Sequence, residues 1–365
     1  MFPRSEVRQM YPVGNRLRLS LFGKSHADCI GCILEGLPIG MHIDKDLISK
    51  EMALRKPSDG IGTPRKESDT VMFEYGLDPN DDVVDGKLLL VIYNGNRNSS
   101  AYDKFKIRPR PGHADLPALF KFKDYDVAGG AQFSGRMTAP LVAAGAIAKQ
   151  YLAHKGVKIH AYTRSIGDVV DNEEHCTTSY GESTSFKTRA MSQELDSEMT
   201  QTILDAGKDE DSIGGTVQCA VTGLPIGFGG EWFDALDVSI ARMMFSIPAV
   251  KGVEFGKGFD ITKMRGSQSN DQYIVKDGKI TSETNNMGGV TGGLSNGMPL
   301  VFRVAIKPTP SIAKEQRTVN LETMTTDTVS VTGRHDPCIV PRAVAVVEAM
   351  AAIAIMDQEL SFTPF

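Results

Sequence analysis

The stretch Pro341-Arg-Ala-Val-Ala-Val-Val-Glu-Ala-Met-Ala-Ala-Ile-Ala-Ile-Met356 decides the fold, because it is helix-forming and apolar on nearly every side. Proline is favourable at the first position of a helix, since the N–H that it lacks would have no helical partner there. A helix without a polar face has to bury its whole circumference. We therefore predict that residues 341–356 lie in the core or in a subunit interface.

A second apolar helix and a series of short strands are predicted upstream. Residues 137–152 place apolar side chains at helical spacing, namely Leu141, Ala144, Ala148 and Leu152. Further helices are predicted over 47–54, 190–206 and 234–245, and strands over 17–22, 29–35, 71–75, 88–93, 157–162, 215–221, 250–255 and 300–306. Gly-Leu-Pro-Ile-Gly follows a predicted strand at 36–40 and again at 223–227, which indicates two similar strand-turn units in two sheets. Residues 168–187 are polar without a pattern, so we expect an exposed excursion there.

The composition is typical of an ordinary soluble globular protein. The 365 residues suffice for one large domain or two with a substantial core, and 41% of them are hydrophobic and 23% charged. The net charge of −5 provides no overall positive field for a nucleic acid, and no apolar run reaches the ~18 residues of a membrane span. Arg4, Glu6 and Arg8 stand where a signal peptide would be apolar, so we expect a cytoplasmic location.

Five cysteines in a chain of this length do not form a disulfide framework. Cys29 and Cys32 have the spacing of a redox or zinc pair, but no matching second pair follows. They interleave with Ile30 and Ile33, which favours buried thiols in a strand. No metal site is predicted.

Two histidines carry the strongest chemical signal. Gly-Lys-Ser-His-Ala-Asp at 23–28 and Arg-Pro-Gly-His-Ala-Asp at 110–115 place His26 and His113 in glycine-containing breaks, each followed by Ala-Asp. Imidazole titrates near neutral pH, and the neighbouring Lys and Arg side chains lower its proton affinity until an anion binds. The pattern indicates a pocket for an acidic small molecule whose chemistry needs two proton donors.

Basic side chains near prolines and glycines indicate anion binding, although each segment also has a structural explanation. Arg55, Lys56, Arg65 and Lys66 bracket a turn rich in Pro, Gly and Ser, which is also typical of a solvated surface loop. The run Gly-Gly-Ala-Gln-Phe-Ser-Gly-Arg at 129–136 leads into a predicted helix. It fits an anion-binding helix N-terminus and a close-packed turn equally well.

Segments later in the chain also have both a ligand-binding and a purely structural explanation. The glycine pairs of 285–297 and the Lys-Pro-Thr-Pro-Ser of 307–311 fit either a clasp for the phosphate or ring edge of a flat cofactor, or structural turns. Gly-Arg-His-Asp-Pro-Cys at 333–338 puts a base, an acid and a guanidinium together ahead of the last helix. Asp336 is then either an acid of the site or only the N-cap of that helix.

Taken in order, these motifs resemble the chorismate synthase family over nearly the whole chain. The matching stretches are 23–38, 110–115, 134–149, 211–259, 284–311 and 333–350. The resemblance implies an α+β fold, a layered β-α-β sandwich in a single domain over residues 1–365, assembled as a homotetramer. It also implies a lyase of aromatic amino acid biosynthesis. This lyase would convert 5-enolpyruvylshikimate 3-phosphate to chorismate and phosphate by a 1,4-elimination that needs reduced FMN without net redox change.

The resemblance further implies roles for individual residues. His26 would protonate the departing phosphate, His113 would hold the reduced flavin in the right protonation state, and Asp336 would help flavin N5 accept the ring proton. The substrate's carboxylates and phosphate would be bound by Ser25, Arg55, Arg110, Arg136 and Arg334. Flavin contacts would come from Gln132, Phe133, Ser134, Pro248, Ala249, Gly292, Lys307, Pro308, Thr309, Pro310, Ser311 and Arg334.

Some positions depart from the family's commonest pattern. Lys24 stands where Glu is usual, Gln132 and Phe133 replace Arg-Ser, and Met137 replaces Glu. The turn over 57–65 is one residue short and lacks its second Arg, and no Gly-x-Gly-x-x-Gly follows a strand. Both features favour an external reductant over reduction of the flavin by NAD(P)H on the chain itself.

Two other classes of function are considered. A flavin-binding protein without catalysis would bind FMN and release no phosphate. An anion- or RNA-binding module would use the same arginines, but the acidic net charge and the few aromatic residues disfavour it.

Overall fold

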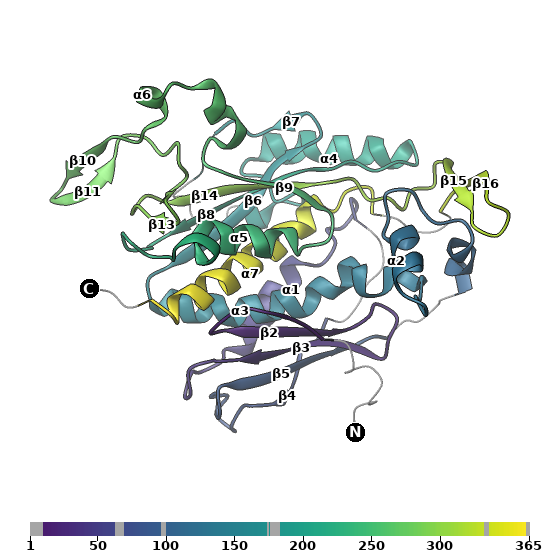
Figure 1. The fold of residues 1–365 in the computed structure, drawn as a ribbon, viewed down its shortest axis with the longest axis horizontal. Helices are drawn as coiled ribbons and strands as arrows, with labels where there is room; N and C mark the ends of the chain where they lie inside the picture. Colours follow the sequence, from purple (N-terminus) through teal and green to yellow (C-terminus); the bar gives the residue numbers. More distant parts are fainter. Residues whose placement is uncertain are drawn as a thin grey trace.

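Two five-stranded antiparallel sheets enclose a layer of helices (Figure 1). The computed structural model describes residues 10–62, 69–95, 100–173, 175, 183–331 and 336–362. The layers run sheet, helices, sheet, so the predicted α+β fold with a layered β-α-β sandwich is confirmed.

The first sheet contains the strands of the N-terminal quarter. Its order is β1-β2-β3-β5-β4. The bounds are β1 Met10–Val13, β2 Arg18–Gly23, β3 Cys29–Glu35, β4 Met72–Tyr75 and β5 Lys87–Tyr93. In β3 the predicted burial of Cys29 and Cys32 is confirmed, and neither forms a disulfide bond within the described residues.

The second sheet is built from strands that are far apart in the chain. Its order is β7-β6-β8-β14-β9. The bounds are β6 Lys158–Ile166, β7 Val169–Val170, β8 Gly215–Thr222, β9 Val250–Phe255 and β14 Leu300–Ile306. The pairing of β14 with β9 shifts register between Ala305 and Ile306.

Helices α3 (Thr138–His154) and α7 (Val340–Glu359) form the centre of the molecule. Every side chain of α7 from Val340 to Met356 is buried except that of Arg342, so the predicted all-round apolar helix lies in the core of this chain. The two helices approach so closely that a Cβ on Gly145 would overlap the Cα and Cβ of Ala349.

Two shorter helices complete the layer and a third lies outside it. The contacts of α7 extend to α1 (Lys45–Leu54) and α5 (Leu236–Phe245). Helix α4 (Gln193–Lys208) lies against the other side of the second sheet (Figure 1).

The repeated pentapeptide marks equivalent places in the two sheets, as predicted. Residues 36–40 follow β3 and residues 223–227 follow β8, and each of these strands is the third in its sheet. Gly36 and Gly223 have φ of 91° and 89°. A Cβ at either position would overlap a backbone carbonyl oxygen, so only glycine fits.

The remaining elements were not predicted. They are the helices α2 Asp115–Lys121 and α6 Gly266–Ser269, and the paired strands β10 Tyr273–Lys276 with β11 Lys279–Ser282, β12 Val290–Thr291 with β13 Leu294–Ser295, and β15 Gln316–Asn320 with β16 Thr325–Val329. These strands are short, and a strand of this length carries little periodic signal.

In the described part of 168–187 most side chains are exposed, as predicted, but the segment also has an ordered strand and two buried side chains. This segment contributes β7 to the edge of the second sheet, and Asp171 and Ser183 are only 3% and 1% exposed. Asp171 accepts a hydrogen bond from the backbone N–H of Glu173, so its burial is compensated. Residues 174 and 176–182 lie outside the described residues.

Candidate active site

A two-glycine turn lies between the two predicted histidines. A Cβ on Gly129 would lie 2.6 Å from Nε2 of His26, and one on Gly130 would lie 3.1 Å from Nε2 of His113. Both glycines have positive φ, 57° and 79°. The histidines, 87 positions apart in the sequence, are therefore brought to the same turn. The two glycines precede α3, which begins at Thr138, and they pack against the two histidines.

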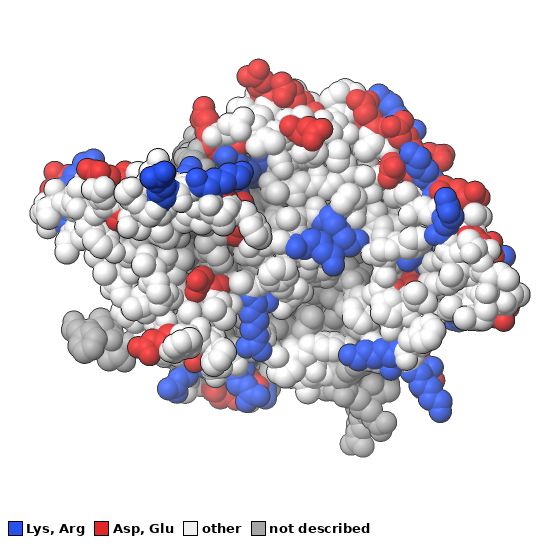
Figure 2. Space-filling view, turned by 45° about the horizontal axis from the view of Figure 1, so that its top comes forward, with Lys and Arg blue, Asp and Glu red and all other residues white. Residues whose placement is uncertain are grey.

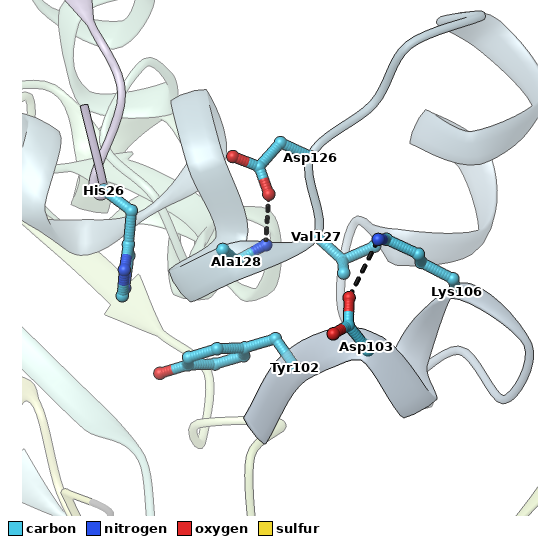
Figure 3. Close-up of a pocket in the computed structure, with 7 residues that line it drawn as sticks. All are labelled: His26, Tyr102, Asp103, Lys106, Asp126, Val127 and Ala128. Carbon is cyan, nitrogen blue, oxygen red and sulfur yellow. Dashed lines mark hydrogen bonds and ion pairs between the residues drawn. The ribbon is translucent and has the colours of Figure 1, made fainter. Parts of the chain in front are cut away.

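His26 lies in the loop between β2 and β3 and lines a cavity of about 290 Å³ (Figure 3). The ring of Tyr102 meets the imidazole edge to face, with 5.5 Å between ring centroids. Ser25 is anchored beside it, because its Oγ donates to the carbonyl of Ala128 at 3.2 Å. The remaining lining residues are Asp103, Lys106, Asp126, Val127 and Ala128.

His113 belongs to a buried charge cluster at the start of α2. Its Nδ1 lies 2.7 Å from Oδ1 of Asp115, which is fully buried. Arg110 also donates to Asp115, from Nε at 2.7 Å and from Nη2 at 2.9 Å. Burial alone would raise the pKa of Asp115, but the hydrogen bonds and charges of His113 and Arg110 lower it to about 2. An ionised Asp115 holds the hydrogen of His113 on Nδ1, which leaves Nε2 facing Gly130.

Of the three cations that flank the histidines in sequence, Arg110 lies beside His113, with its Nη2 3.3 Å from Nδ1 of the imidazole, and the other two pair with carboxylates. Lys24 forms an ion pair with Asp126 at 3.2 Å, and Arg108 forms one with Asp327 at 2.5 Å. A paired cation has little net field at a neighbouring group.

Arg55 and Arg136 share one buried carboxylate. Asp69 accepts from Nη1 of Arg55 at 2.9 Å and from Nη1 of Arg136. Arg55 also donates from Nε to Thr138 at 2.9 Å and from Nη2 to the carbonyl of Gly135 at 3.0 Å. All three side chains are less than 10% exposed. The pair of arginines thus carries one net positive charge at the start of α3, and their planes are fixed before any ligand binds.

The segment 307–311 joins the His113 cluster to Asp336. Ser311 accepts from Nη1 of Arg110 at 3.1 Å, and Thr309 donates to the backbone carbonyl of Asp336 at 2.9 Å. Pro310 lies beside Gly112, where a Cβ would meet it at 3.6 Å. The structure therefore brings together the first and second histidine motifs, the Lys-Pro-Thr-Pro-Ser segment and the acid that precedes α7.

Asp336 is not the N-cap of α7. The N-cap residue is Ile339, and no side chain caps this helix. The carboxylate of Asp336 instead forms an ion pair with Arg342 in the first turn of the helix. This removes the N-cap alternative for Asp336, whereas Arg334 lies outside the described residues.

The other predicted flavin contacts lie in two places. Ala249 follows Pro248 and accepts from the backbone N–H of Lys307 at 3.0 Å, so these residues adjoin the 307–311 segment. Gln132, Phe133 and Ser134 follow the two-glycine turn. Gly292, by contrast, lies in the β12–β13 turn, toward the opposite end of the molecule from α2 (Figure 1). Within this chain, Gly292 is therefore not part of the site around His113.

Three residues of this site were missed from the sequence, namely Asp69, Tyr102 and Asp115. Asp115 had a signal, because both histidines are followed by Ala-Asp at the same spacing. No sequence pattern indicated Asp69 or Tyr102, since the tertiary fold brings Asp69 to its arginines and Tyr102 to His26. Among the described residues, no group of three or more His, Cys, Asp or Glu side chains could hold a metal ion.

Lys and Arg side chains are scattered over the face of the molecule that Figure 2 shows. Figure 2 shows a hollow near the middle of one face, with isolated Lys and Arg side chains in and beside it. Asp and Glu side chains lie mostly along the upper edge of that view. In the described part of the chain, no helix is long and apolar enough to cross a membrane.

Imidazoles, ionised carboxylates and buried guanidiniums that meet in one place define an acid–base enzyme for an anionic small molecule. The model of the chorismate synthase family matches residues 17–360. The chain belongs to the chorismate synthase family. Its members are lyases of the shikimate pathway, and this is the activity of the chain.

Individual relatives agree with this assignment. A chorismate synthase of Dehalococcoides mccartyi (strain 195) is 41% identical over 350 residues, covering 95% of this chain and 96% of the relative. One of Thermococcus gammatolerans is 41% identical over 348 residues, covering 95% and 97%. A crystal structure of a chorismate synthase superposes with a TM-score of 0.75 at 28% identity, covering 96% of this chain and 93% of that one.

Proposed function

We propose that this chorismate synthase eliminates phosphate from 5-enolpyruvylshikimate 3-phosphate in the presence of reduced FMN, at the place where His26 and His113 meet. The observation that carries this proposal is the two-glycine turn, which each histidine approaches with its Nε2. When bound, reduced FMN supplies an electron-rich ring that accepts a proton from the substrate.

His26 is the proposed donor of the proton to the departing phosphate. Its loop is anchored through Ser25, and it lines a cavity together with Tyr102. A positioned general acid of this kind contributes about 10²–10⁴-fold to a rate. Ser25 would donate or accept a further hydrogen bond to the same phosphate.

His113 is the proposed partner of the flavin, and Asp115 fixes its tautomer. With the Nδ1 hydrogen directed at Asp115, the Nε2 atom is left to exchange a proton with a bound group. Asp336 is held by Arg342 and adjoins the segment of Thr309, so it would act on the same ring.

The arginine set suits a substrate with two carboxylates and a phosphate. Arg55, Arg110 and Arg136 provide three guanidiniums against the two carboxylates of Asp69 and Asp115. Their burial in a low-dielectric region strengthens the attraction for an anion. Arg334 is proposed as a fourth cation, on the family resemblance alone.

The residues present fit a flavin phosphate and ring edge. Lys307 is half-buried, and burial together with the positive charge of Lys251 lowers its pKa. The same segment has the hydroxyls of Thr309 and Ser311, and Pro248, Ala249, Pro308 and Pro310 give it rigid, largely apolar walls. Gln132, Phe133 and Ser134 are proposed to border the ring from the side of the two-glycine turn.

A direct test uses purified protein, substrate and photoreduced FMN under anaerobic conditions, with phosphate release as the readout. His26→Ala and His113→Ala should each lower the rate by at least about 10²-fold. His42→Ala is the matched control, because His42 is exposed and pairs with Asp82 outside the site. Near-normal turnover in either site variant would remove the role proposed for that histidine.

Gly292 and the assembly belong to the same proposal. Since Gly292 lies far from His113 in this chain, a flavin contact from it requires a second copy, in keeping with the proposed homotetramer that shares flavin sites near its interfaces. Trp232 and Phe233, adjacent and 83% and 91% exposed, offer apolar surface for such contacts. We further propose one domain over residues 1–365, a cytoplasmic location and an external reductant for the flavin.

A further inference from the structure

A short 3₁₀ helix after β5 contacts both histidine motifs. This helix, η1, comprises Ser100–Lys106. Its residue Tyr102 presents a ring to the imidazole of His26. Its residue Phe105 lies against Arg110 of the second motif, with the guanidinium carbon 4.5 Å from the centroid of the phenyl ring. The position of Tyr102 relative to His26 is therefore set partly by the second motif.

Phe105 anchors η1 in the fold. Its side chain is 1% exposed and packs in an apolar cluster that also contains Val127. The ring of Tyr102 lies next to that of Phe105, with 6.2 Å between the centroids. Lys104 of the same helix donates a hydrogen bond to the carbonyl of Ser330 at 2.9 Å. Because burial and a long-range hydrogen bond hold η1, the ring of Tyr102 is presented from a fixed backbone.

Close neighbours of the imidazole of His26 include the two-glycine turn and Tyr102. A Cβ on Gly129 would lie 2.5 Å from Cδ2 of the imidazole. The ring of Tyr102 is 5.5 Å away between centroids and inclined at 72°, and both rings line the same cavity (Figure 3). The torsion that turns an imidazole about its Cβ–Cγ bond has broad preferences, so the backbone of the loop does not by itself fix the plane of the ring. Contacts with neighbouring groups have to fix it.

We infer that Tyr102 is a positioning residue for His26, whose imidazole plane it holds through the edge-to-face contact of the two rings. Such a contact stabilises one relative orientation of two aromatic rings beyond the area that it buries. A proton donor has to lie within hydrogen-bond reach of the atom that it protonates, so a turned imidazole transfers its proton more slowly. The inference concerns the ring of Tyr102 and not its hydroxyl, and it rests on the proposed role of His26 as the general acid.

The test compares variants of Tyr102 with the wild type in the anaerobic phosphate-release assay with photoreduced FMN. Tyr102→Leu keeps an apolar side chain but loses the aromatic ring, so kcat should fall by about three- to tenfold, the range that one aromatic pair spans. Tyr102→Phe keeps the ring and should retain most of the turnover. The KM for the substrate should change little in either variant. Tyr75→Leu, on the outermost strand β4 of the first sheet, is the control and should turn over as the wild type does.

A double-mutant cycle with His26→Ala separates positioning from a general structural role. A residue that acts through His26 has no further effect once the imidazole is gone, so kcat of His26→Ala should agree with that of the double variant within about twofold. A further loss of about three- to tenfold in the double variant would overturn the inference, because Tyr102 would then act on another group or on the fold.

Two other results also overturn the inference. One is equal kcat in Tyr102→Leu and the wild type, and the other is a raised KM with unchanged kcat, which would make Tyr102 a substrate contact. Thermal unfolding of each variant checks that it is folded at the assay temperature, and Tyr102→Met replaces Tyr102→Leu where the latter is not. Near-normal turnover in His26→Ala defeats the proposed function instead, so the two failures are distinguishable.

Discussion

At the scale of single residues, the geometry of the site is set by the ion pairs between its cationic side chains and buried carboxylates. Asp115 combines two tasks, because it neutralises Arg110 and orients the ring of His113. Both tasks need the ionised form, and the lowered pKa of about 2 keeps it ionised at every physiological pH. Asp69 pairs with both Arg55 and Arg136.

Replacement of Asp115 by Asn should change the pH dependence of stability and of turnover. A depressed pKa stabilises the folded state above the unfolded value near 3.8, and this contribution disappears as the pH falls toward 2. It amounts to about 2 kcal/mol. In urea titrations the wild type should therefore lose more unfolding free energy between pH 4 and pH 2 than Asp115→Asn does. Its kcat should also fall by about 10²-fold or more, since Asn can favour the wrong tautomer of His113.

Asp196→Asn is the control for this variant. Asp196 is also buried and accepts from the N–H and hydroxyl of Thr188, but it lies outside the site. It should lower stability without altering the pH profile of turnover. An unchanged kcat in Asp115→Asn would contradict the orienting role.

At the scale of elements, the close crossing of α3 and α7 and the hairpin of β15 and β16 set the geometry. The hairpin holds the Arg-Pro-Arg-Pro segment in place, since Thr318 donates to the carbonyl of Pro109 at 2.5 Å and Asp327 pairs with Arg108. At the crossing, α3 and α7 lie so close together that only glycine fits at position 145.

Gly145→Ala should lower the free energy of unfolding by about 1–3 kcal/mol, although alanine is the better helix former. The added Cβ would overlap backbone atoms of Ala349, so the helices have to move apart. Gly207→Ala in α4 is the matched control, because its Cβ would make an ordinary contact of 3.6 Å with Pro337. It should stabilise the protein by about 0.5–1 kcal/mol. Equal effects of the two substitutions in thermal denaturation would refute the crossing argument.

At the scale of the whole molecule, one buried charge network ties the helical layer to the second sheet. Lys149 of α3 lies 2.6 Å from Glu51 of α1 and 2.7 Å from Glu348 of α7. Glu348 also accepts from the backbone N–H of Ala161 in β6 at 2.6 Å. Burial raises the pKa of Glu51, and the charge of Lys149 opposes this. The network satisfies a strand N–H at an edge that β7 does not cover.

Lys149→Met should cost about 3–5 kcal/mol of stability, because two buried carboxylates lose their shared cation. Adding Glu348→Gln should recover part of this loss, since the amide oxygen still accepts from Ala161 while one unpaired charge is removed. A double-mutant cycle by urea denaturation measures the coupling. Purely additive losses would show that Lys149 and Glu348 do not stabilise each other.

The sequence was sufficient to locate most of the helices and strands. It was insufficient to show which side chains pair with one another across the fold. The long strands and helices were located within a few residues, because periodicity is a local property of the chain. The β10–β11 and β15–β16 hairpins were missed, since their strands have only four or five residues and expose most of their side chains. Within the polar run over 168–187, the burial of Asp171 was not predicted, because it depends on hydrogen bonds that composition does not reveal.

By itself, the sequence determined that residues 341–356 are buried, that the pentapeptide ends two equivalent strands, and that the histidine motifs belong to one family's chemistry. Only the tertiary structure decided which charges cancel. Asp69 reaches Arg136 across 67 positions and Lys24 reaches Asp126 across 102. The physical reason is that hydrophobic pattern acts through near neighbours in the chain, whereas an ion pair depends on distance in space and on the loss of water around both groups.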